Sequence, residues 1–177
     1  MKKVVLIVGL LAMAVSSCKK EETSKEETVA DGRDVLIGNY SGSVTTKYFD
    51  SDGGDTTLIE KTDDNFTCKV VKSGTNNLAI SIFNSSNELA LTTNTTEIAQ
   101  EPNKENYWIK ISSPIKTSEG DYEGLRTYFE NPYHGLFNFQ NGKTFSLNLR
   151  SVNQDTIIVD GIKYENVSVE ATYNFKK

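Results

Sequence analysis

Residues Asn166–Phe175, near the end of the chain, read NVSVEATYNF, and this stretch determines the predicted fold class. Apolar or aromatic side chains occupy every second position, and polar side chains lie between them. Successive side chains of a β-strand point to opposite faces, whereas a helix repeats every 3.6 residues. The stretch is therefore predicted to be a β-strand whose inward face carries Val167, Val169, Ala171, Tyr173 and Phe175.

The same period of two recurs upstream, and clusters of turn-forming residues separate the runs. Alternation is clear in Tyr40–Tyr48, Leu78–Ile82, Tyr107–Ile111 and Phe145–Leu149. Turns are expected at Asp52–Gly54, Asp63–Asn65, Ser73–Asn77 and Asn84–Asn87, and type I′ hairpin turns at Asn141-Gly142 and Asp160-Gly161.

Counting the runs predicts about nine to eleven short strands between residues 34 and 177. Because the connections are short, neighbouring strands should be antiparallel. We expect an all-β fold, an up-and-down meander that closes into a barrel, with a two-sheet β-sandwich as the alternative. The stretch 119–134 is irregular and fits either a strand or helical turns, so the strand topology between residues 113 and 134 stays open.

The N-terminus has the layout of a targeting segment. A basic start, Met1-Lys2-Lys3, precedes the apolar run Val4–Val15, which ends in Ser16-Ser17-Cys18. This ending resembles the lipobox of bacterial lipoproteins. The resemblance implies a signal peptide over residues 1–17 and acylation of Cys18, which anchors the protein in a membrane. An ordinary secretory signal with an incidental cysteine is the alternative.

The residues after Cys18 contain a possible second targeting signal. Lys19, Lys20, Glu21 and Glu22 resemble the surface-export signal of lipoproteins in one Gram-negative lineage. The resemblance implies the cell outer membrane with the protein facing outward, or otherwise the periplasmic face; a plain charged spacer explains the same residues. The polar segment 18–33 is expected to be a flexible tether that reaches about 20 Å.

The charge and the cysteine content of the chain exclude some kinds of binding partner and site. Cleavage before Cys18 removes Lys2 and Lys3 and leaves 17 basic against 24 acidic side chains, a net charge of −7. Such a balance argues against nucleic-acid binding, which needs a basic surface. With Cys18 acylated, Cys68 has no partner, so neither a disulfide within the chain nor a cysteine-based metal site is expected.

The first predicted strand carries a second family resemblance. Ile37–Gly42 reads IGNYSG and is similar to the opening Gly-x-Trp motif of lipocalin-like (calycin-type) β-barrels, with Tyr40 in place of the tryptophan that closes the barrel floor. The resemblance implies a lipocalin-like barrel over residues 34–177.

The residue types needed for catalysis are sparse. His134 is the single histidine, and no serine-nucleophile motif is present. The acidic stretch around Asp50, Asp52 and Asp55 lacks the later ligands of a calcium loop, since Lys61 occupies the position of the bidentate glutamate. We therefore expect no enzyme activity, no catalytic residue, no metal and no cofactor.

Aromatic side chains suggest a binding surface. Trp108 lies between two inward-facing residues and should point outward, where it could stack on a sugar ring together with Tyr122, Tyr128 and Tyr133. The alternative is that Trp108 packs under a loop. The sequence thus predicts a membrane-anchored, non-catalytic module that binds a small apolar ligand or a glycan, or else a structural subunit that contacts an outer-membrane protein.

Overall fold

The computed structural model describes residues 31–50, 56–102, 105–117, 120–126, 132–140 and 142–177. The contacts group Asp31–Lys177 into one compact unit, separate from Met1–Ala30. The predicted signal peptide, Cys18, the export residues Lys19–Glu22 and Tyr128 lie outside the described residues, as do the expected turn at Asp52–Gly54 and Asn141 of the expected Asn141-Gly142 turn.

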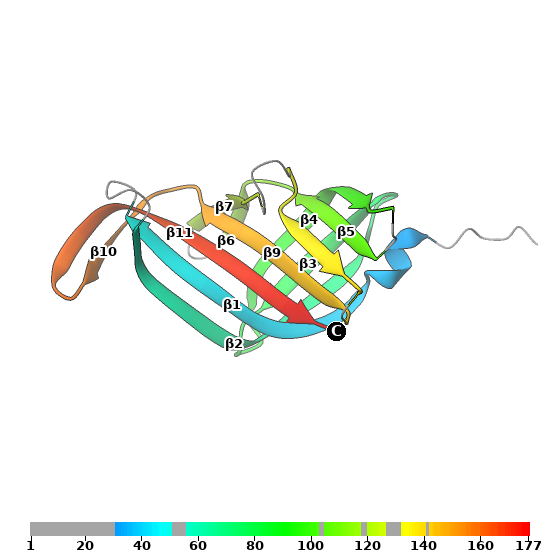
Figure 1. Ribbon diagram of the computed structural model, residues 1–177, viewed down its shortest axis with the longest axis horizontal. Coiled ribbons are helices and arrows are strands. Elements are labelled where there is room, and N and C mark those ends of the chain that lie inside the picture. Colours follow the sequence, from blue (N-terminus) through cyan, green and yellow to red (C-terminus); the bar gives the residue numbers. More distant parts are fainter. Residues whose placement is uncertain (1–30, 51–55, 103–104, 118–119, 127–131, 141) are drawn as a thin grey trace, which may run out of the picture. The chain divides into compact units, whose positions relative to one another are not determined.

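The described part is an antiparallel all-β structure of eleven strands, as predicted (Figure 1). Hydrogen bonds run through eight of them in a closed ring, in the order β11-β1-β2-β3-β4-β5-β8-β9 and back to β11. The ring is a barrel-like, up-and-down meander, and its continuity excludes the alternative of two separate sheets. Its strands are β1 (Gly38–Asp50), β2 (Thr56–Ser73), β3 (Asn77–Phe83), β4 (Leu89–Gln100), β5 (Asn106–Ile111), β8 (Gly135–Asn138), β9 (Thr144–Ser151) and β11 (Ile162–Lys176).

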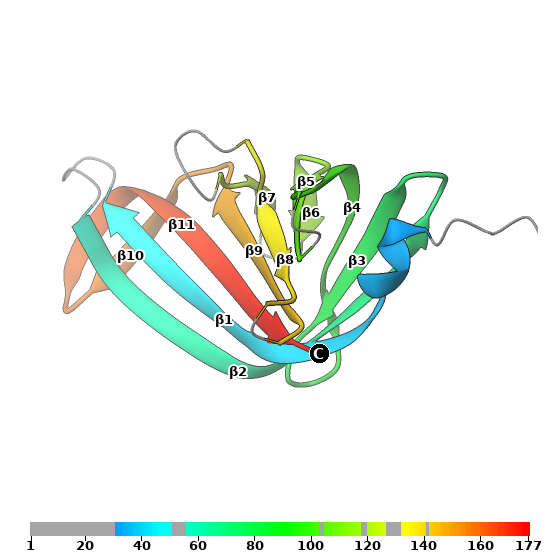
Figure 2. The same ribbon diagram turned by 45° about the vertical axis from the view of Figure 1, so that its right-hand side comes forward.

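Three further strands extend the ring. β6 (Ile115–Thr117) and β7 (Gly120–Gly124) form a hairpin, and β7 pairs with the end of β9 that β8 leaves free. β10 (Asp155–Val159) pairs with the start of β11. In Figure 2, β1, β2, β10 and β11 run well past the short strands β3 and β8, so one side of the barrel is much longer than the other.

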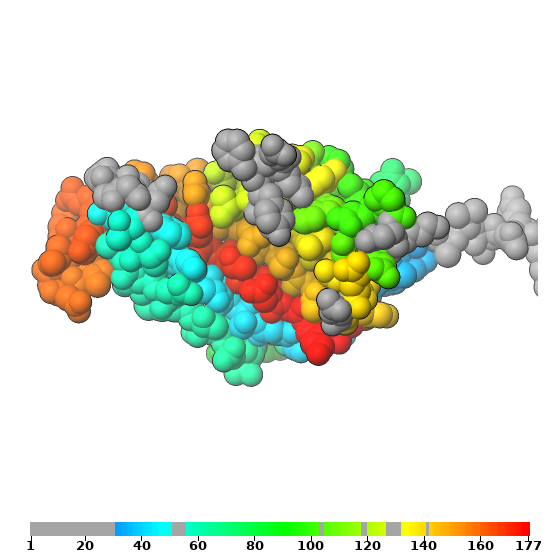
Figure 3. All heavy atoms as spheres, viewed as in Figure 1, coloured from blue at the N-terminus to red at the C-terminus, as the bar shows by residue number. Residues whose placement is uncertain are grey.

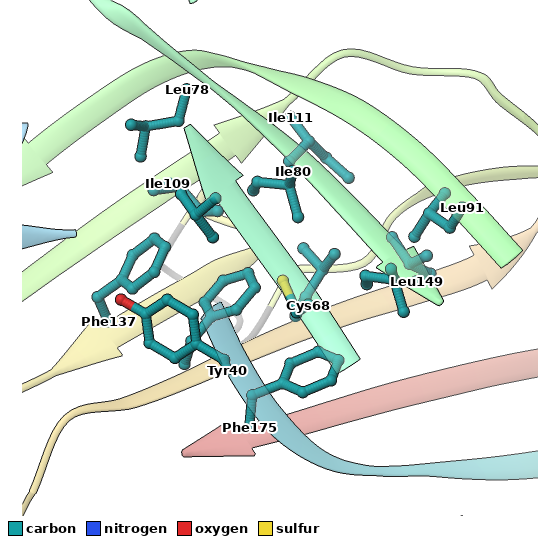
Figure 4. Packing of buried hydrophobic residues seen from close by; sticks show 14 of the residues in the cluster. Tyr40, Cys68, Leu78, Ile80, Leu91, Ile109, Ile111, Phe137, Leu149 and Phe175 are labelled. Atoms are coloured by element: carbon teal, nitrogen blue, oxygen red, sulfur yellow. The ribbon is translucent and has the colours of Figure 1, made fainter. Parts of the chain in front are cut away.

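One end of the barrel is closed by the 3-10 helix η1 (Gly32–Val35) and the residue that follows it. Leu36 is fully buried, and its carbonyl oxygen accepts a 2.6 Å hydrogen bond from the hydroxyl of Tyr40. The Tyr40 ring packs 6.0 Å from Phe137 and 6.2 Å from Phe145, measured between ring centroids. Figure 4 shows Tyr40 beside Phe137 at this end of the core and Leu91 and Leu149 at the other.

The alternation in Asn166–Phe175 predicted the burial of β11 correctly. Val167, Val169, Ala171 and Phe175 are buried and Tyr173 is half-buried, while the residues between them face outward. The turn at Asp160-Gly161 is also confirmed, with φ values of 51° and 80° that suit a type I′ hairpin.

The turn expected at Asp63–Asn65 is wrong. These residues lie within β2, an 18-residue strand that pairs with β1 on both sides of them. The pairing advances by two residues in β1, from Gly42 to Val44, and by three in β2, from Phe66 to Asp63. The extra residue forms a β-bulge with Asn65 at φ 66°, so turn-forming residues here bend a strand instead of ending it.

Candidate functional site: a cavity at the end of the barrel away from η1

A cavity of about 350 Å³ lies at the end of the barrel away from η1. Its walls come from the outer halves of β1 and β2, from the β3–β4 turn with the start of β4, and from β6, β7, β9 and β11. It forms because β3 ends at Phe83, opposite Thr67, while β2 continues for another eleven residues beside β1. Beyond Phe83, β3 no longer pairs with β2, so the barrel wall is incomplete there. The inner face of β1 and β2 is left open at that point.

The base of the cavity is apolar. The five side chains there are buried, with at most 6% of their surface exposed, and they come from four different strands: Val44, Leu91, Leu149, Val169 and Ala171. Cross-strand pairing places Ala171 between Thr46 of β1 and Leu149 of β9. Ala171 carries the smallest side chain of the five, and therefore leaves more room in the base than its neighbours do.

Aromatic rings form much of the wall. Tyr48, Phe66, Tyr122 and Tyr173 line the cavity. The rings of Phe66 and Tyr173 meet edge to face, with centroids 6.2 Å apart, and Tyr173 stacks on Phe175 at 6.1 Å. These contacts join the wall to the core, which fixes the rings before any ligand arrives.

Charged and polar side chains are concentrated at the rim. Lys61, Asp63 and Glu88 are exposed and line the opening. The ammonium of Lys61 lies 5.9 Å from the centroid of the Tyr48 ring, within the range of a cation–π contact. A cavity with an apolar base and a charged rim suits a molecule that has an apolar body and one polar end.

Two of the residues predicted to form an outer aromatic surface, Trp108 and Tyr133, lie together on the outer face of the barrel wall, whereas Tyr122 lines the cavity instead. Trp108 points outward between the buried Tyr107 and Ile109, as expected, and its ring centroid lies 6.4 Å from that of Tyr133. The indole Nε1 donates to Glu101 Oε1 at 2.7 Å, and the hydroxyl of Tyr133 donates to Glu97 Oε1 at 2.7 Å. The half-buried indole is thus built into a polar network, which agrees with a packing role.

Lys110 completes this network. Its ammonium donates to Glu97 Oε2 at 2.6 Å and lies 5.2 Å from the Tyr133 ring. The hydrogen bonds from Lys110 and Tyr133 lower the pKa of Glu97, and the bond to Glu97 raises the pKa of Tyr133. The carboxylate therefore stays ionised and keeps its place between the two side chains.

The single histidine lies between strands. His134 Nδ1 accepts a 3.2 Å hydrogen bond from the backbone N–H of Ile111, and its ring packs against Gly124 so closely that a Cβ there would overlap it. Burial, then Lys110 and Arg126, lower the pKa of His134, while Glu123 acts in the opposite direction. The neutral imidazole joins β5 to the start of β8.

Cys68 is a free thiol in the core. It is 1% exposed, and burial raises its pKa to about 12, so the reactive thiolate does not form near neutral pH. Across the described ranges, no cluster of three or more His, Cys, Asp or Glu side chains is placed to hold a metal ion. The described part of the chain also has no helix with the length and hydropathy needed to cross a bilayer.

Comparison with known proteins finds no matching family and no significant similarity to a curated protein or a solved structure.

This cavity could not be predicted from the sequence. Alternation placed Tyr48 and Tyr173 on the inner face, but no sequence signal showed that β2 outruns β3. The expected turn at Asp63–Asn65 hid the length of β2. If those three residues had been interpreted as a bulge within a long strand, Lys61 and Asp63 would have been placed beside the opening.

Proposed function

We propose that the chain is an acylated envelope lipoprotein whose barrel-like domain binds a small amphipathic ligand, with the apolar part of the ligand on Val44, Leu91, Leu149, Val169 and Ala171 at the base of the cavity. The observation that carries the proposal is the cavity of about 350 Å³ with its apolar base, aromatic wall and charged rim. That volume lies within the usual range of small-molecule sites, roughly 300–1,000 Å³.

Location is the other half of the proposal. Cys18 holds the acyl chains, the residues between Cys18 and Asp31 join them to the barrel, and Lys19–Glu22 direct the protein to the outer surface of the outer membrane. Asp31, the first described residue, lies next to η1 at the closed end of the barrel. The tether therefore joins the domain at the end away from the cavity.

The cavity is tested with an apolar fluorescent probe and a variant that fills the base. N-phenyl-1-naphthylamine should gain fluorescence in the parent protein, and Ala171→Phe should bind it at least about tenfold more weakly because the ring occupies the base. Ala79→Phe is the matched control, since Ala79 faces outward on β3.

Circular dichroism separates loss of the cavity from loss of the fold, and Ala79→Phe shows the effect of adding a phenylalanine outside the cavity. Equal probe binding by the parent and Ala171→Phe, with both proteins folded by circular dichroism, would refute the site. A parent that takes up no probe would instead favour the role of a structural subunit in an outer-membrane assembly. Binding of a glycan that Trp108→Ala abolishes would point to the outer aromatic pair.

A further inference from the structure

A second depression, of about 420 Å³, lies on the outside of the barrel and extends from Lys177, near the closed end, to Asn87 in the β3–β4 turn. Register places one outward row of residues across four strands, namely Lys176 of β11, Ser41 of β1, Thr67 of β2 and Phe83 of β3. In Figure 3 the red end of β11 and the cyan start of β1 lie together at the lower edge of the molecule. The depression is thus a feature of the folded sheet and not of one loop.

Its charge is positive. Lys69, Lys176 and Lys177 line it, and the described residues that line it include no acidic side chain. Some lysines elsewhere in the described barrel are paired with carboxylates, as in Lys47 with Glu60 and Lys110 with Glu97. Lys69 and Lys176 have no ion pair among the described residues, so their charges are available to an external anion.

Lys177 belongs to both the depression and the closed end. Its ammonium donates to the carbonyl oxygen of Ile37 at 2.6 Å and lies 5.7 Å from the centroid of the Tyr40 ring. Ile37 lies two residues after η1, so Lys177 lies near the end of the barrel where the tether joins it. The thirteen residues from Cys18 to Ala30 span at most about 45 Å when extended and about 20 Å as a flexible coil.

We propose that this basic depression, defined by Lys69, Lys176 and Lys177, docks onto the phosphate groups of anionic lipid headgroups. The inference rests on the proposed acyl anchor, which keeps the closed end within a few tens of ångströms of the bilayer. Because the mature chain has a net charge of −7, an anionic surface repels most of the molecule and attracts this end.

The test uses the chain from residue 18 with Cys18→Ala, so that binding does not depend on acyl chains. Sedimentation is measured with phosphatidylcholine vesicles, with and without about 30% phosphatidylglycerol. Binding should require the anionic lipid and fall steeply as salt is raised. Lys69→Gln with Lys176→Gln should bind about 30-fold more weakly.

The matched control is Lys47→Gln with Lys163→Gln, which removes the same charge from two exposed ion pairs elsewhere on the barrel. It should bind as well as the parent. Equal weakening in both double variants, a parent that does not bind the anionic vesicles at low salt, or parent binding that ignores lipid charge or salt, would each overturn the docking surface. The probe titration with Ala171→Phe is independent of vesicles, so failure here leaves the cavity proposal standing, and the reverse also holds.

Discussion

His134 illustrates how a single residue can be structural in a position that first suggests chemistry. The sequence correctly isolates it as the one histidine, but it gives no sign that Nδ1 accepts the N–H of Ile111. That contact joins residues 23 positions apart, and it exists only once β5 and β8 are adjacent. Local sequence cannot supply such a partner.

The His134 contact predicts a pH dependence of stability. Since folding lowers its pKa from the ordinary 6.5, the unfolded chain takes up a proton before the folded chain does. The free energy of unfolding should therefore fall as pH drops from about 7 through 6.5 and on through the lowered folded pKa. Urea unfolding at a series of pH values measures this.

His134→Gln keeps an acceptor and removes the titration. We expect its stability to change less than that of the parent between pH 7 and 5, where most carboxylates remain ionised. Parallel stability curves for the two proteins across this window would rule out His134 as the source.

At the scale of single elements, the strands with strict alternation were predictable and the bent strand was not. β5, β9 and β11 show apolar residues at every second position, and burial follows that pattern in all three. The prediction failed for β2 because Asp and Asn residues, as in Asp63-Asp64-Asn65, occur both in turns that end a strand and in bulges that bend one. The β6–β7 hairpin could not be predicted from the sequence, because strands of only three and five residues are too short to show a clear alternation.

The bulge in β2 predicts the effect of two substitutions at one position. Asn65 has φ 66°, in the left-handed region that glycine adopts freely and that β-branched residues avoid. Asn65→Gly should leave stability nearly unchanged, whereas Asn65→Val should lower the free energy of unfolding by about 1–2 kcal/mol. Chemical denaturation of the three proteins gives both values.

The two Asn65 variants should also differ in how well the cavity binds the probe. Relaxation of the bulge in Asn65→Val would shift Lys61 and Asp63 relative to Phe66, so probe binding should weaken along with stability. If valine is tolerated as well as glycine, the backbone at residue 65 does not hold the left-handed conformation, and the register of β2 needs revision.

At the scale of the whole molecule, the two ends of the barrel differ in packing. The closed end is filled by Leu36, Tyr40, Phe137 and Phe145, while the other end holds the cavity. The sequence predicted the class of fold from alternation and turn spacing. It could not predict this polarity, which depends on the unequal lengths of neighbouring strands.

The central claim is that the cavity holds a small molecule in the protein as it occurs in the cell. Native mass spectrometry of the protein extracted from its own membranes in mild detergent tests it most directly. We predict a non-covalent adduct of a few hundred daltons that is released on denaturation and is absent from Ala171→Phe. A bare polypeptide in the parent, or an adduct that Ala171→Phe retains in full, would contradict the claim.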